Sequence, residues 1–317
     1  MNDDHLTEFA GLPVVAFTPG TRPDEPRPPA GEAAWAVRGD WANEPYRDVF
    51  ARFMDAVDTT QVTALVIGFW GFDGAGGVGA RTLVEAAGRF PNLRAVFLGD
   101  IVDEEFHISW IQHDDITPLV EAFPALERLE VRGGLNLALS PIRNPNLKVL
   151  RFESGGLPAE IVRAVTASDV PALERLDLWL GDPQYGGDTE LGDLAPILTG
   201  ERLPALRHLG LRNCVFQDEI AAEIASAPVV ARLETLGLGM GLLTDRGAEE
   251  LLAGQPLTHL STLDLEYHYL SEPMMERLRA ALPGVRVELG EAQGAAEPDG
   301  GDEDDEWDTE MYIAVSE

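Results

Sequence analysis

A glycine-rich run at residues 74–79, GAGGVG, is the first feature of this sequence that could carry chemistry. It follows an apolar stretch at 62–70 that is typical of a strand, and it precedes a helix-like run at 80–89. Glycines at this spacing let a backbone approach the pyrophosphate of a dinucleotide at a helix N-terminus, and Asp100 lies where such sites place an acid for the ribose. A nucleotide-binding enzyme is therefore one hypothesis for the chain.

The sequence around the glycines argues against that hypothesis. Residues 71–73 separate the apolar stretch from the first glycine of the run, whereas the dinucleotide fingerprint requires a tight turn. The apolar stretches that follow repeat one leucine-rich pattern and contain no second nucleotide-binding half. We favour a glycine-rich linker between a strand and a helix, and we expect no cofactor.

A cluster of carboxylates and imidazoles within residues 100–115 could in principle bind a metal ion. The two histidines are six residues apart, which does not match the spacing of paired ligands on one helix face. We instead predict a solvated insertion loop, held down by apolar side chains such as Phe106 and Trp110, with both histidines at the surface and no metal site. The cluster consists of Asp103, Glu104, Glu105, His107, His113, Asp114 and Asp115.

Nucleophilic catalysis finds little support in this sequence. There is no G-x-S-x-G motif, and the single cysteine, Cys214, falls where a repeat requires a small buried side chain. Because buried thiols are inert, we predict that the protein is not an enzyme and has no catalytic residues. One cysteine also excludes an internal disulfide and fits a reducing compartment, so we expect a cytoplasmic protein.

The dominant feature of the chain is a nine-residue phrase, as in VPALERLDL (170–178) and LPALRHLGL (203–211), which occurs seven times after one weaker copy. Each copy is apolar at its fourth, seventh and ninth residues, and the last two alternate across a polar residue as in a strand with one buried face. The fourth residues, which we call anchors, lie 21 to 33 residues apart. They are Val62, Leu93, Leu126, Leu147, Leu173, Leu206, Leu233 and Leu260.

Helix-period runs follow most of these phrases. Thr244 and Ser271 precede two of the runs and are expected to cap the helices at their N-termini. The unit that begins at Leu126 is too short for a helix, so residues 133–145 should form an extended loop. Because no unit can bury its apolar stripe alone, the units must stack into one continuous core. The other expected helices span 81–89, 116–122, 159–166, 191–199 and 219–226.

These residues resemble the ribonuclease-inhibitor-like class of leucine-rich-repeat proteins, whose repeat reads L-x-x-L-x-L-x-x-(N/C)-x-L and continues into a helix. Most units here lack Asn or Cys at the place that Cys214 occupies in its unit. The resemblance implies an α/β solenoid of about eight units over residues 59–290, curved into a horseshoe with parallel strands on the concave face and helices on the convex face. The match is best at Leu206, Leu209, Leu211, Cys214 and Phe216.

The whole chain is similar to a bacterial family that combines this repeat with a proline-rich N-terminal cap and an acidic tail. Residues 1–58 would then form the cap, with a proline-rich loop at 18–30 and a helix near 45–57 over the first repeat. Residues 291–317 would be the tail, disordered at 297–310 and docked at its partly apolar end. Members are often encoded beside radical-SAM and ATP-grasp proteins, which implies an accessory subunit of a modifying-enzyme system.

Polar side chains two, four and six residues after each anchor should line the concave face, on strands about 4.8 Å apart. Glu130 then neighbours Arg151 and next Asp177, while Arg132 neighbours Glu153, and each such pair adds about 0.2–1 kcal/mol to the sheet. The candidate partner-binding residues on the four middle strands are Arg128, Glu130, Arg132, Arg151, Glu153, Arg175, Asp177, Trp179, His208 and Arg212.

These charges could serve the sheet alone or form a binding surface. Arginines beside a tryptophan are typical of interface hot spots, and they stand out in a chain of net charge -32. Small residues on the flanking strands, such as Ala64 and Gly237, would frame them with smooth ground. We therefore favour a non-catalytic scaffold, monomeric alone, that binds a protein partner through the concave face.

The strongly negative charge makes nucleic acid and anionic membranes poor partners, because both are themselves negative. The first residues are acidic where a secretion signal would be basic. No stretch approaches the roughly 20 apolar residues that a membrane span requires.

Overall fold

The computed structural model describes residues 4–22, 25–40, 44–71, 76–293 and 311–316. These residues form one twelve-stranded sheet whose strands lie side by side in the order of the sequence. The strands from β2 to β12 run parallel, and β1 pairs antiparallel with β2. The strands are β1 (Glu8–Phe9), β2 (Leu12–Phe17), β3 (Ala34–Val37), β4 (Ala64–Gly68), β5 (Ala95–Asp100), β6 (Arg128–Arg132), β7 (Val149–Glu153), β8 (Arg175–Gly181), β9 (His208–Cys214), β10 (Thr235–Gly237), β11 (Thr262–Asp264) and β12 (Arg286–Glu288).

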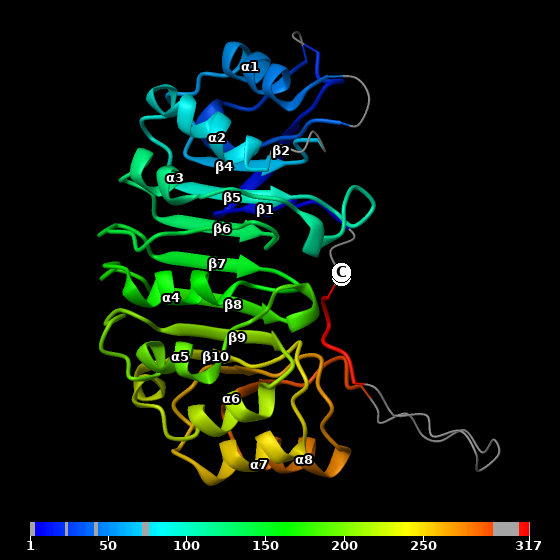
Figure 1. The fold of residues 1–317 in the computed structure, drawn as a ribbon, viewed down its shortest axis with the longest axis vertical. Helices are drawn as coiled ribbons and strands as arrows, with labels where there is room; N and C mark the ends of the chain where they lie inside the picture. Colours follow the sequence, from blue (N-terminus) through cyan, green and yellow to red (C-terminus); the bar gives the residue numbers. More distant parts are fainter. Residues whose placement is uncertain (1–3, 23–24, 41–43, 72–75, 294–310, 317) are drawn as a thin grey trace, which may run out of the picture.

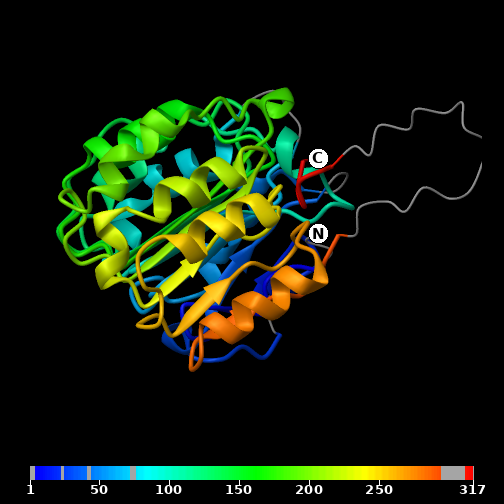
Figure 2. The same ribbon diagram turned by 90° about the horizontal axis from the view of Figure 1, so that it is seen from below.

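Helices connect most of the parallel strands and cover one face of the sheet. Figure 1 shows the strands stacked like rungs along the long axis, and Figure 2, turned by 90°, shows the helices on the outer side. Successive parallel strands that are neighbours in space, with helices along one face, are consistent with a repeat solenoid. The helices are α1 (Tyr46–Ala56), α2 (Val78–Glu85), α3 (Thr117–Ala122), α4 (Ala159–Ala167), α5 (Leu191–Leu198), α6 (Gln217–Ile224), α7 (Asp245–Ala253) and α8 (Glu272–Ala281).

Local sequence signals explain where the helices begin. The side chain of Thr244 accepts a hydrogen bond from the Arg246 amide at the start of α7, and Ser271 accepts one from the Met274 amide at the start of α8. Both caps are confirmed, as is a helix at each run where the sequence predicts one. Between β6 and β7 the described chain has no helix, in agreement with the extended connection expected at 133–145.

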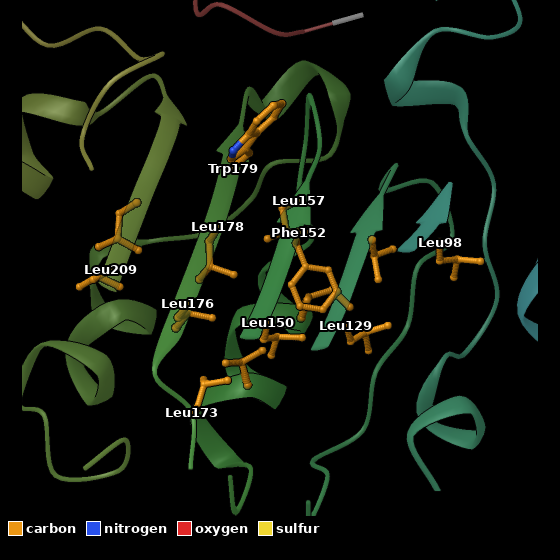
Figure 3. Close-up of a cluster of buried hydrophobic side chains, with 14 of the residues drawn as sticks. Leu98, Leu129, Leu150, Phe152, Leu157, Leu173, Leu176, Leu178, Trp179 and Leu209 are labelled. Carbon is orange, nitrogen blue, oxygen red and sulfur yellow. The ribbon is translucent and has the colours of Figure 1, made fainter. Parts of the chain in front are cut away.

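The buried leucines form rows that run across the strands. All eight anchors are at most 3% exposed. One further row joins Leu129, Leu150, Leu176 and Leu209, which lie opposite one another in the registers of β6 to β9. Figure 3 shows these four side chains pointing to the same side of adjacent strands. Each leucine thus packs against its counterparts in the turns before and after it.

The sheet extends further at both ends than the repeated phrase indicates. β2 and β3 add two parallel strands within the predicted cap, and β12 adds one after the last phrase. A short apolar run, AWAV at 34–37, and an alternating segment, VRVEL at 285–289, carry this signal in the sequence. The helix expected near 45–57 is present as α1, whose Phe50 and Phe53 are fully buried.

The N-terminal hairpin covers the first strands on the face of the sheet opposite the helices, which we call the inner face. Phe9 of β1 packs edge-to-face on Phe97 of β5, with ring centroids 5.9 Å apart. The two rings bury a group of small side chains that includes Ala34, Ala64 and Val66. The expectation that Ala64 borders an open surface is therefore wrong, since these residues are small because the hairpin lies on them.

At the other end of the chain, residues 311–316 lie beside the strand ends, as the red segment in Figure 1 shows. They contact residues at the ends of several strands and form no strand of their own. The disorder predicted for 297–310 falls outside the described residues. None of the described helices is long and apolar enough to cross a membrane.

Because the leucine rows hold the turns together, Leu176→Ala should lower the free energy of unfolding by about 2–5 kcal/mol. Leu176 is fully buried, whereas Trp110 is 48% exposed, so Trp110→Ala should change stability by no more than about 0.5 kcal/mol. Urea unfolding followed by circular dichroism measures both. Equal losses for the two variants would contradict the role given to the rows.

Candidate binding surface

The inner-face residues expected from the sequence lie on one side of β6 to β9, in the predicted order. Arg132 is opposite Glu153, and Glu130 is followed across the sheet by Arg151 and Asp177. Further along, Trp179 pairs in register with Arg212. The anchor spacing alone therefore predicted which side chains are neighbours.

Five of these residues form a dense ion-pair network. Arg132 Nε lies 2.8 Å from Glu153 Oε2, and Arg151 Nη2 lies 3.0 Å from Glu153 Oε1. The Glu130 carboxylate forms ion pairs with Arg128 Nη1 at 3.0 Å and with Arg151 Nη1 at 3.8 Å. Burial raises the pKa of Glu130 above its usual range, although Arg151 and Arg128 oppose this shift. A buried carboxylate is expensive unless it is paired, so this network is a requirement of the sheet itself.

Arg212 of β9 forms a second set of ion pairs, which reaches from β8 to β11. Its guanidinium lies 2.7 Å from Asp264 Oδ2 and 3.5 Å from Asp177 Oδ1. A side chain at Gly237 would overlap this guanidinium. Gly237, which we expected to be part of a flat surface beside the charged residues, instead leaves room for the Arg212 side chain. Arg212 crosses over Gly237 to reach Asp264.

Exposure divides the candidate residues into two groups. Glu130, Arg132, Glu153 and Trp179 are each less than 10% exposed, so they support the sheet and present almost no surface to another molecule. The partly open side chains are those of Arg128, Arg151, Arg175, Asp177, His208 and Arg212.

Arg175 is the least neutralised of the open side chains. It makes no ion pair within 4.0 Å among the described residues. Burial lowers the pKa of Arg175, and the charges of Arg128 and Arg151 lower it further, against the effect of Asp177. The guanidinium of the neighbouring Arg151 already has a partner within the sheet, since it stacks over the Trp179 ring at 5.3 Å from the centroid. An anion placed at Arg175 would therefore offset the cost of burying this charge.

A hollow adjoins Arg128 where the strands begin. It has a volume of about 300 Å³ and lies between the β1–β2 turn at Ala10 and the starts of β4 to β7. Arg94 and Lys148 line it together with Glu127, and Lys148 is paired with Glu127 at 2.7 Å. The open arginines of the inner face thus continue into a mainly basic rim.

The N-terminal segment is held by a polar centre that the sequence did not reveal. Asp100 is fully buried and accepts hydrogen bonds from Arg38 Nε at 3.0 Å and from the Leu6 amide at 3.2 Å. The Nδ1 atom of His5 lies 3.3 Å from the same carboxylate. Glu105 lies 3.6 Å from the other ring nitrogen of His5. Asp100, the candidate ribose ligand, is thus used to fasten the hairpin. Nothing in the spacing of His5 and Arg38 indicated this contact.

The glycine-rich run packs against the next turn of the solenoid. Residues 72–75 lie outside the described chain. A side chain at Gly76 would approach the His113 carbonyl oxygen to 2.5 Å, and Gly77 has a φ of 73°, which favours glycine. Arg81 of α2 forms an ion pair with Asp114 beside them. A side chain at Gly79 would likewise approach Ile67 to 2.7 Å, so packing accounts for the described glycines of the run.

The cluster of acids and histidines between β5 and α3 is spread over separate contacts. His113 is fully buried, with Nε2 at 2.8 Å from the Arg132 carbonyl oxygen, and burial lowers its pKa to about 4. The expectation that His113 is at the surface is therefore wrong. His107 is exposed and bonds Asp103 at 2.7 Å. The described residues include no group of three or more side chains placed to hold a metal ion.

Cys214 occupies the framework place predicted for it. Its side chain is fully buried at the end of β9, and burial raises the pKa of the thiol to about 12. A thiol that stays protonated is a poor nucleophile.

Comparison with known proteins yields one informative relative. No family model matches the chain, and no curated protein does. Among 26 chains of solved structures that match, a Bacteroides fragilis protein is 32% identical over 78% of this chain and 70% of its own, with a TM-score of 0.74. The chain belongs to the family of this Bacteroides protein.

A second solved structure, an internalin from Listeria monocytogenes, is a far weaker match. Its identity is 12% and its TM-score 0.37, over 72% of this chain and 54% of its own. This likeness is too low to support an inference about fold or function, so the family relationship depends on the Bacteroides protein.

The contact between His5 and Asp100 makes stability depend on pH. Hydrogen bonds to Asp100 and then Glu105 raise the pKa of His5 to about 9, against burial and the charge of Arg38. Because the unfolded pKa is near 6.5, this stabilisation is complete below about pH 6.5 and is lost as the pH rises toward 9. The difference in unfolding free energy between the protein and His5→Gln should shrink over that range in urea titrations. A constant difference would contradict the contact.

The buried pair on β6 and β7 should be sensitive to neutralisation. Glu153→Gln leaves Arg132 and Arg151 without their shared carboxylate, so we expect a loss of about 3–5 kcal/mol in unfolding free energy. The control is Glu127→Gln, which removes an exposed pair with Lys148 and should leave the urea midpoint unchanged. If both variants unfold at the same midpoint as the parent, the network does not stabilise the sheet.

Proposed function

We propose that this protein is a non-catalytic interaction protein with leucine-rich repeats of the ribonuclease-inhibitor-like class. In this proposal, the stacked turns curve into a horseshoe, and a protein partner binds its inner face at β6 to β9. Support for the class comes from the recurring phrase and from Cys214 at the Asn/Cys place of its repeat. Resemblance to the bacterial family with an acidic tail supports a role as accessory subunit of a modifying enzyme.

The observation that carries the proposal is the state of Arg175. It is partly buried on the inner face and forms no ion pair within 4.0 Å among the described residues, whereas Arg128, Arg151 and Arg212 each have a carboxylate partner. Burial lowers the pKa of Arg175, and the charges of Arg128 and Arg151 add to this shift. A carboxylate from a partner would supply the missing counter-charge. Arg128 and the basic rim at Arg94 and Lys148 would extend such a contact.

The open residues suit an acidic, extended segment of a partner protein. Arginine binds carboxylates through two parallel hydrogen bonds, and a partly desolvated site strengthens each bond. His208 and Thr235 follow Arg175 in the same register row, and a 3.0 Å hydrogen bond joins their side chains. The buried residues Glu130, Arg132 and Glu153 act indirectly, by holding the open arginines in place.

Charge reversal at the centre of the face should abolish partner binding. Arg175→Glu adds a carboxylate beside Asp177 and removes the available guanidinium, so we expect at least an approximately tenfold loss in the amount of partner captured from native cells. The matched control is Arg286→Glu, because Arg286 lies in the same register row four turns later and is largely exposed. Equal capture by Arg175→Glu and the parent protein, with unchanged melting temperature, would overturn the proposal.

A further inference from the structure

The last described residues, 311–316, which we call the strap, are held almost entirely through their backbone. The Asn213 amide donates to the Val315 carbonyl oxygen at 2.6 Å and accepts from the Val315 N–H at 3.0 Å. The Ala314 N–H donates to the Met240 carbonyl oxygen at 2.8 Å. A single side-chain amide that satisfies both backbone groups of one residue acts as a neighbouring strand would.

Tyrosines and a serine hold the two ends of the strap. The hydroxyls of Tyr267 and Tyr269 each donate to the Tyr312 carbonyl oxygen at 2.9 Å, and the Tyr312 N–H lies 2.9 Å from the Tyr269 hydroxyl. Ser109, far away in the sequence, donates to the Ser316 carbonyl oxygen. The strap therefore spans from the turn after β11 to the connection after β5.

The side chains of the strap alternate in their surroundings. Ile313 is 5% exposed and Val315 packs against the main core, whereas Tyr312 is 61% exposed. A glycine, Gly155, lets the chain approach closely, because a side chain there would overlap the Ser316 carbonyl oxygen. Recognition thus needs an extended backbone and inward aliphatic groups.

The turns that contact the strap have an unusual backbone. Asn213 lies at the end of β9, and Met240 and Tyr267 take the matching places just beyond β10 and β11; their φ angles are 52°, 69° and 59°. The ends of β5, β6 and β8 place glycines in this left-handed region. Residues other than glycine are uncommon there, and such strained positions concentrate at binding sites. Each of the three strained residues donates to the strap or accepts from it.

We propose that the loops after β9, β10 and β11 form a docking groove for an extended peptide with inward aliphatic residues at alternate positions, and that the strap is its resident occupant. A partner segment with the same pattern binds this groove when the strap leaves. The groove uses none of the open inner-face arginines, so it stands or falls independently of the proposed concave-face partner.

Exchange of the strap is energetically accessible. Ordering six residues costs backbone entropy that offsets much of what a few hydrogen bonds and one buried isoleucine contribute. The strap also forms no part of the leucine rows, so its departure leaves the rows intact. Segments with this balance open at lower cost than the core around them.

The test uses the full chain carrying Ile313→Asp, which places a charge in the apolar contact and releases the strap. A fluorescein-labelled peptide of residues 308–317 should bind this variant saturably in anisotropy titrations, and bind the parent chain about tenfold or more weakly because its groove is filled. Adding Asn213→Gly should weaken binding to the variant by about tenfold or more, since the two hydrogen bonds to the strap are lost while glycine keeps the left-handed backbone. The substitution also removes a hydrogen bond to the Ser154 carbonyl oxygen.

The matched control is Tyr312→Ala, which changes the outward side chain and should leave the parent's weak peptide binding unaltered. Circular dichroism melting confirms that every variant is folded. No saturable binding to the Ile313→Asp chain, equal binding to the parent, or indifference to Asn213→Gly would each overturn the groove. If the parent elutes as a dimer that Ile313→Asp dissociates, the occupant is the strap of a second copy, and the proposal of a foreign peptide is overturned.

Discussion

The whole structure depends on one constraint, which is that no single turn of the solenoid can bury its own apolar stripe. Leu176 is shielded only because Leu150 and Leu209 lie on either side of it. Each turn is therefore stabilised by its neighbours, and the ends must be closed by something else. At the N-terminal end, α1 and the β1–β2 hairpin do this with aromatic side chains such as Phe9 and Phe53.

The same stacking brings charged side chains of successive turns to a spacing at which they must be paired. On the inner face the result is a network whose deepest members, Arg132 and Glu153, have lost nearly all contact with water. The network fixes the guanidinium groups nearer the surface, and rigid placement is what allows a charge to recognise a partner at low entropic cost. Structural support and recognition are consequently divided between neighbouring residues on the same strands.

Sequence periodicity was enough to predict the parallel strands β4 to β11, most helices and the neighbours on the inner face, because a strand alternates its side chains strictly. It did not indicate β2, β3 and β12 at the two ends of the sheet. It could not show which of those side chains would be covered. The contact of Phe9 with Phe97 and that of Asn213 with Val315 join residues far apart in the chain, and neither leaves a periodic trace. His113 was misplaced for the same reason, since the segment that buries it comes from another turn.

The last strand, β12, shows how the other end of such an array is finished. Among the described residues no strand pairs with its outer edge, so its backbone groups could accept a further strand from another molecule. Arg286 and Glu288 project from this short edge and are paired at 3.2 Å. Ionic side chains on a short edge would have to lose their hydration if a foreign strand approached, which opposes end-to-end growth into fibres.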